Sequence, residues 1–181
     1  MLYDMKRIYS YYTVRKEIRI HRKRTRSHKR RWNKRRDHVN LELMNSHRFY
    51  KKFEGIVNSK VVSESMYKEA MEILESRNNT LYEEIVAIDA RTGKRLVKNT
   101  MAIDMERTHA CGFLYSEIEL LNSRKTPFEV IHNHPNNSFP SSADIRKLFE
   151  REWQSGSTII CHDGTVYRIG KVKPLKDIDL Y

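Results

Sequence analysis

The sequence has little cysteine and no long apolar run. Its two cysteines, Cys111 and Cys161, lie far apart and form no CxxC pair, which argues against a disulfide framework and against a cysteine-rich zinc ribbon. This usage favours a reducing, cytoplasmic location. No stretch approaches the roughly eighteen consecutive apolar residues of a membrane span, so we expect none. The first residues, MLYDMKRIYSYY, contain neither a continuous apolar segment nor a small-residue cleavage site, so we expect no signal peptide.

Acidic residues are scarce near the N-terminus. Residues 1–36 hold fifteen Lys or Arg but only two acids, Asp4 and Glu17, a net charge of +13. Residues 37–181 hold twenty Lys or Arg against twenty-one acids, so the formal charge of +12 belongs to the first segment. We therefore divide the chain into a basic arm (1–36), a connecting segment (37–60) and a folded domain (61–181). We expect the arm to be helical or partly disordered and to become more ordered on a polyanion.

After the arm, helical patterns alternate with short strand-like segments. SESMYKEAMEILESR (63–77) predicts a helix that Ser63 caps, with an apolar stripe at helical spacing. A hairpin follows, with a strand Ile85–Asp89, a turn at 91–93 and a return strand through Val97. Further elements are expected as helices over 113–124 and 141–153, a strand over 128–131, and a last hairpin that turns at Asp163-Gly164. This order predicts an α/β fold with a mixed sheet flanked by helices.

The segment HNHPNNSFPSSAD (132–144) concentrates the side chains that can carry chemistry. His132 and His134 end a β-prone run and, being two residues apart, project to the same side of a strand. Two imidazoles on one side can bind one zinc ion at about 2.0–2.1 Å each. After a loop with two prolines, Asp144 is placed on the next helix to return as a third ligand. A His₂Asp set leaves the fourth tetrahedral position open for water, as a catalytic zinc site requires.

This pattern resembles the signature of the JAMM (MPN+) metalloproteases, which is a distant Glu, then HxHP, a short loop and SxxD. HNHP (132–135) followed by SSADI (141–145) is most similar to the RadC-like branch. The resemblance implies a JAMM/MPN-like, cytidine-deaminase-like fold, zinc bound by His132, His134 and Asp144, and an oxyanion stabilised by Ser141. Between His134 and Ser141 the loop is one residue shorter than the family's usual pattern.

The resemblance also implies a general base, a Glu at the start of the first strand, where this chain has Glu83 and Glu84. Only one of the two can face the metal in an extended segment. Over about residues 50–170 the chain resembles the JAMM-like C-terminal tails of phage minor-head proteins, which read Tyr-Glu-acid here and favour Glu83. The small Ala87, three residues after Glu84, is an argument for Glu84. Both remain candidates.

Two functions follow from these observations. The first is a zinc-dependent metalloprotease or isopeptidase in which a Glu-activated water attacks the amide carbonyl of a peptide or isopeptide substrate. The second is a catalytically silent JAMM-like protein that binds nucleic acid or takes part in the assembly of a phage or mobile element. In that case residues 1–36 would contact nucleic acid or another polyanion by charge, with Trp32 among the aromatics available for stacking. The letters HNH do not indicate an HNH nuclease, whose histidines lie far apart in sequence.

Overall fold

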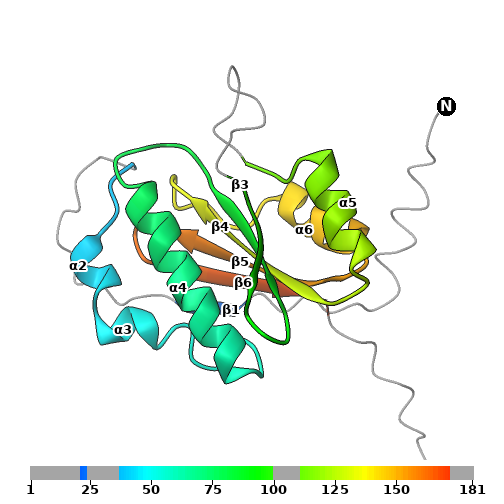
Figure 1. Cartoon of the computed structure of the whole chain (residues 1–181). Coiled ribbons are helices and arrows are strands. Elements are labelled where there is room, and N and C mark those ends of the chain that lie inside the picture. The colour runs from blue at the N-terminus through cyan, green and yellow to red at the C-terminus, as the bar shows by residue number, and fades with distance from the viewer. Residues whose placement is uncertain (1–20, 24–36, 100–110, 172–181) are drawn as a thin grey trace, which may run out of the picture.

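A single sheet with helices on both faces organises the described part of the chain (Figure 1). The structure is a computed structural model that describes residues 21–23, 37–99 and 111–171. The helices are α2 (Leu41–Met44), α3 (His47–Tyr50), α4 (Lys60–Ser76), α5 (Tyr115–Ser123) and α6 (Ser142–Glu150). The strands are β1 (His21–Lys23), β2 (Ile85–Asp89), β3 (Arg95–Asn99), β4 (Phe128–His134), β5 (Gln154–Cys161) and β6 (Val166–Gly170).

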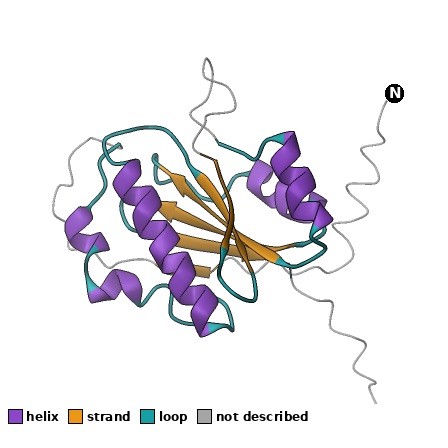
Figure 2. Cartoon of the chain, in the orientation of Figure 1, coloured by secondary structure: helices purple, strands orange, loops and turns teal. Residues whose placement is uncertain are grey.

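The sheet is mixed, with the strand order β1-β6-β5-β4-β2-β3 (Figure 2). Strands β4 and β5 are parallel, and the other neighbouring pairs are antiparallel. Parallel neighbours need a crossover, and α6 supplies it between β4 and β5. The predicted α/β fold with a mixed sheet flanked by helices is confirmed at this level.

Side chains alternate between the two faces of the sheet. On β2, Val86 and Ile88 pack into one core with α4. The intervening Ile85 and Ala87 pack into a second core that includes Leu121 of α5. Helix α6 packs against β5 in a third cluster, on the side of the sheet away from α4. The sheet therefore separates α4 from α5 and α6, as Figure 1 shows.

The predicted hairpins are confirmed. Strand β2 has the predicted bounds, and the two turns contain Gly93 and Gly164 with φ angles of 72° and 81°. Glycine adopts such positive φ angles without the steric cost of a Cβ. Strand β4 extends three residues beyond the predicted run of 128–131, so both histidines lie within the strand and not after it.

Helix α4 begins at Lys60, three residues before the predicted start. Ser59 caps it, because its hydroxyl accepts a hydrogen bond from the backbone N–H of Val62 at 3.4 Å. The capping role expected for Ser63 was wrong. Ser63 is buried inside the helix, and its hydroxyl donates to the carbonyl of Val57 at 3.3 Å.

Residues 37–60, treated above as a connection, contain α2 and α3 and pack on the domain. Met44, Phe49 and Phe53 are buried in the same core as α4 and the sheet. The backbone N–H of Asn40 donates to the carbonyl of His162 at 3.1 Å, which ties this segment to the β5–β6 turn. The segment therefore belongs to the folded unit.

Lys52 carries a pH-dependent part of the stability of this packing. Its ammonium group donates to the carbonyl of Gly164, and burial lowers its pKa from 10.5 to about 8, although Asp163 partly opposes the shift. Between these two values the unfolded chain binds more protons than the folded chain, so the free energy of unfolding should rise with pH in this window. We expect Lys52 to contribute up to about 3 kcal/mol of that rise. Urea denaturation between pH 8 and 10.5 should show a smaller rise for Lys52→Met, and an equal rise would contradict the assignment.

Of the basic arm, the structure describes only His21–Lys23, which forms β1 along β6. This part is a strand, whereas the arm was expected to be helical or partly disordered; the edge of β6 offers backbone groups that an extended segment can pair with. The rest of the arm, and with it the predicted polyanion contact, lies outside the described residues. Within the described ranges, no helix has both the length and the apolar composition needed to cross a bilayer.

Candidate metal centre

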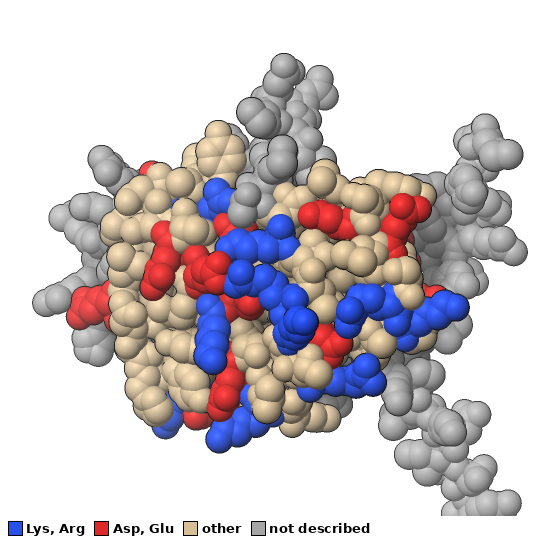
Figure 3. All heavy atoms as spheres, viewed as in Figure 1, with Lys and Arg blue, Asp and Glu red and all other residues tan. Residues whose placement is uncertain are grey.

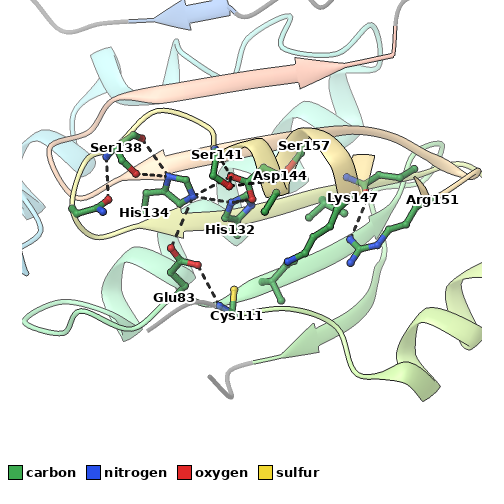
Figure 4. Close-up of a pocket in the computed structure, with 15 residues that line it drawn as sticks. Glu83, Cys111, His132, His134, Ser138, Ser141, Asp144, Lys147, Arg151 and Ser157 are labelled. Carbon is green, nitrogen blue, oxygen red and sulfur yellow. Dashed lines mark hydrogen bonds and ion pairs between the residues drawn. The ribbon is translucent and has the colours of Figure 1, made fainter. Parts of the chain in front are cut away.

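His132 and His134 lie at the carboxyl end of β4 and point to the same side, as their spacing predicts. Each is only 5% exposed, and their Nε2 atoms are 3.1 Å apart. They share the face of β4 with Val130, which packs in the core beneath α5. After the strand, the chain turns back and α6 begins with Ser141 as its N-cap, which brings Asp144 of the first helical turn over the imidazoles (Figure 4).

The carboxylate of Asp144 meets both rings. Its Oδ1 lies 3.3 Å from Nε2 of His132, and its Oδ2 lies 3.5 Å from Nε2 of His134. Ligand atoms about 2.0–2.1 Å from a tetrahedral ion are about 3.3–3.4 Å from one another. The two distances from Asp144 are made by different oxygens, but one donor atom from each of the three residues lies within 4.8 Å of the other two, so the predicted donor set is brought together. These three residues could hold one metal ion.

The side chains of this cluster shift one another's pKa values. Burial alone would raise the pKa of Asp144, but hydrogen bonds with His132, His134 and Ser141 outweigh burial and hold that pKa far below its usual range. Burial alone would lower the pKa of His134, but Asp144 and Glu83 raise it above its usual value. The partly buried carboxylate of Asp144 is thus stabilised by the donors beside it. Because a metal binds an unprotonated imidazole nitrogen, an ion at this site would compete with protonation of His134.

Ser138 orients one of the histidines, and the sequence analysis assigned it no role. Its hydroxyl lies 3.0 Å from Nδ1 of His134, and its carbonyl oxygen lies 3.3 Å from the same atom. These contacts direct Nε2 of His134 toward Asp144, as the outer partners of metal-binding histidines do. A Ser four residues after HxH in a loop carries no signal that could have identified it.

Glu83 is the acid that reaches the site. Its Oε1 lies 3.9 Å from Nε2 of His134, and its Oε2 accepts a hydrogen bond from the backbone N–H of Cys111 at 3.2 Å. Glu83 precedes β2 in phase with Ile85 and Ala87, which face α5 and not α4. The carboxylate is therefore held from one side with its other oxygen directed at the imidazole.

Glu84 points away from the site, so its candidacy as general base is corrected. It is fully buried beneath α4, where it accepts hydrogen bonds from Ser76 and Arg77 at 2.9 Å each and pairs with Lys98 at 2.7 Å. The argument from Ala87 was wrong, because a residue three positions away in an extended segment lies on the opposite face. Acidic and basic side chains lie side by side over α4 and the neighbouring strands (Figure 3).

Ser141 supports the ligand carboxylate. Its hydroxyl donates to Oδ2 of Asp144 at 2.7 Å, and it accepts from the backbone N–H of Asp144 at 3.2 Å. The backbone N–H of Ser141 donates to the same Oδ2 at 2.7 Å, which completes a capping box. The Ser-x-x-Asp spacing therefore keeps its helical phase although the preceding loop is one residue shorter than in the resembled family.

All of these side chains except Glu84 line one pocket of about 270 Å³. Figure 4 shows the histidines and Asp144 at one end, Glu83 and Cys111 below them, and Lys147 and Arg151 of the α6 side toward the other end. One pocket is thus lined by the candidate metal ligands, by the acid Glu83 and by two cations, Lys147 and Arg151. Neither cation was predicted as part of the site, although their spacing from Asp144 indicates that they share one helical face.

Comparisons of the chain with protein-family models, curated proteins and solved structures gave no match. The resemblance to the JAMM metalloproteases therefore rests on the motif and remains a prediction. The geometry of the pocket is a property of this chain's own residues and does not depend on the resemblance.

Proposed function

We propose that this chain is a zinc-dependent hydrolase of amide bonds, of the JAMM metalloprotease type. The observation that carries the proposal is the convergence of donor atoms from His132, His134 and Asp144 to within 4.8 Å of one another, with Glu83 beside them in the same pocket. Zinc suits this site better than magnesium or calcium, because two of the three donors are imidazoles. Bound zinc would supply Lewis acidity, which activates water and polarises the scissile carbonyl.

Glu83 would move the proton. Its Oε2 is held by the backbone N–H of Cys111, which leaves Oε1 directed at the site. There it would accept a proton as the water oxygen bonds to the carbonyl carbon. It would then deliver that proton to the amide nitrogen as the C–N bond breaks, so that the products are a carboxylic acid and an amine.

Ser141 would steady the oxyanion. Its hydroxyl lines the pocket and can rotate from Asp144 toward a carbonyl oxygen bound beside the histidines. Asp144 keeps its bond from the backbone N–H of Ser141 when the hydroxyl turns away. The capping box therefore allows one side chain to serve the ligand in the resting site and the substrate during the reaction.

Removal of the metal should abolish amide hydrolysis, and zinc should restore it. The full chain would be incubated with a mixture of short synthetic peptides, and mass spectrometry would count the new ends. Chelator-treated protein should produce none, one equivalent of zinc per chain should restore cleavage, and magnesium should not, because it prefers oxygen donors. Cleavage that survives chelation, or no cleavage at any zinc concentration, would refute the proposed function.

A further inference from the structure

One face of α6 carries three charged side chains into the pocket. Asp144, Lys147 and Arg151 stand at i, i+3 and i+7, so they fall on one stripe of the helix and its C-cap. All three line the same pocket (Figure 4). The helix that supplies a candidate metal ligand at its first turn therefore supplies two cations farther along.

Neither cation has a carboxylate partner within salt-bridge distance among the residues that the structure describes. Arg151 is partly buried. Its guanidinium donates a hydrogen bond to Oε1 of Gln154 at 3.2 Å, and its Cζ lies 5.0 Å from the ring centre of Phe113. Lys147 is also partly buried. The exposed Arg146 on the same helix, by contrast, pairs with Glu150 at 3.6 Å. Glu150 interacts with Arg151 electrostatically but forms no salt bridge with it. A partly buried positive charge without a hydrogen-bonded carboxylate is incompletely stabilised, so an anion from outside the chain would stabilise it further.

We propose that Lys147 and Arg151 bind a carboxylate of the substrate, close to the amide bond that is cleaved. This inference rests on the proposed function, because it takes the metal end of the pocket as the point of cleavage. A helix rises 1.5 Å per residue, so the α-carbons of Lys147 and Arg151 stand about 4.5 and about 10.5 Å along the axis from that of Asp144. An extended peptide advances about 3.3 Å per residue, which places the carboxylate about one to three residues from the scissile bond.

The size and the lining of the pocket favour an acidic peptide over a nucleic acid. Its volume of about 270 Å³ has room for a short stretch of extended chain, and the carboxylate of Glu83 in its lining disfavours the repeated negative charges of a nucleic acid. Arg151 contacts an aromatic ring and an amide, so its guanidinium is held in place before ligand arrives. A fixed guanidinium matches the planar carboxylate group.

Binding of peptides to the zinc-loaded Glu83→Gln chain tests whether the pocket prefers an acidic substrate, and it does not require cleavage. Calorimetry would compare otherwise identical peptides that carry Glu or Gln at one, two or three residues from a central Gly-Gly bond. A second pair, with a free or an amidated C-terminus, separates a side-chain carboxylate from a terminal one. The best acidic peptide should bind about tenfold more tightly than its neutral partner.

Substitutions then test whether Lys147 and Arg151 cause the preference for the acidic peptide. Lys147→Gln and Arg151→Gln, each in the Glu83→Gln background, should reduce the preference for the acidic peptide several-fold, whereas Arg146→Gln on the same helix should leave it unchanged. Thermal melting checks that each variant is folded, and Lys147→Gln alone suffices if Arg151→Gln unfolds.

Three outcomes would overturn the inference. They are equal affinity for acidic and neutral peptides, a preference that survives both substitutions, and a pocket that selects a short oligonucleotide over the acidic peptide. Acid-selective binding without hydrolysis by the unsubstituted chain would instead sustain this inference and count against the proposed function.

Discussion

A chain in which His132 and His134 are both replaced by alanine should bind no zinc, whereas the unsubstituted chain should bind one ion. The two substitutions remove both imidazoles and leave Asp144 as the sole ligand of the set. Apparent binding free energies of structural zinc in zinc-finger peptides are about 10–16 kcal/mol at pH 7. If the donors share this energy about evenly, the loss exceeds about 5 kcal/mol, or roughly 10⁴-fold in affinity. Equilibrium dialysis followed by metal analysis measures it directly.

His162→Ala is the matched control. His162 is also buried, but its Nδ1 contacts the carbonyl of Asp37 at 3.0 Å and its ring lies outside the pocket. This variant should keep one zinc ion per chain, so zinc loss cannot be ascribed to the mere removal of a buried imidazole. Zinc should also raise the melting temperature of the control and of the unsubstituted chain but not that of the double variant. Full zinc occupancy in the double variant would place the metal elsewhere.

The sequence predicted the parts of the site that depend on local geometry. The common face of His132 and His134 follows from strand alternation, and the position of Asp144 follows from its place in the first turn of a capped helix. The intervening loop did not need to be predicted in detail. A parallel crossover returns the chain to the same sheet, and this restricts where the helix can begin.

The choice between Glu83 and Glu84 could not be made from local pattern, because it depends on long-range pairing. It required the register of β2 against β4, in which Ile85 stands opposite His132, and the position of α4 on the other face. The contribution of residues 37–60 to the core is non-local for the same reason. Their apolar residues showed no clean period, and the surface that buries them comes from α4 and the sheet.

Glu83→Gln should lower kcat for amide hydrolysis by about 10²- to 10⁴-fold while zinc binding is retained. The amide oxygen of the glutamine can still accept from the backbone N–H of Cys111, so the side chain keeps its place but loses its basicity. The same assay on the neighbouring variant, Glu84→Gln, should show the opposite pattern. Glu84 is fully buried between Arg77 and Lys98, so loss of its charge should cost about 3 kcal/mol of stability.

These adjacent glutamates separate chemistry from folding within a single dipeptide. Glu83 faces the imidazoles and Glu84 faces α4, so one substitution should change rate at constant melting temperature and the other should change melting temperature at constant rate per folded molecule. Urea denaturation of each variant measures its stability. Steady-state kinetics, corrected for the folded fraction, measures its rate per folded molecule. Equal loss of rate in both variants would mean that the effect is structural. Full activity in Glu83→Gln would remove the proton carrier from the proposed mechanism while leaving the metal ligands in place.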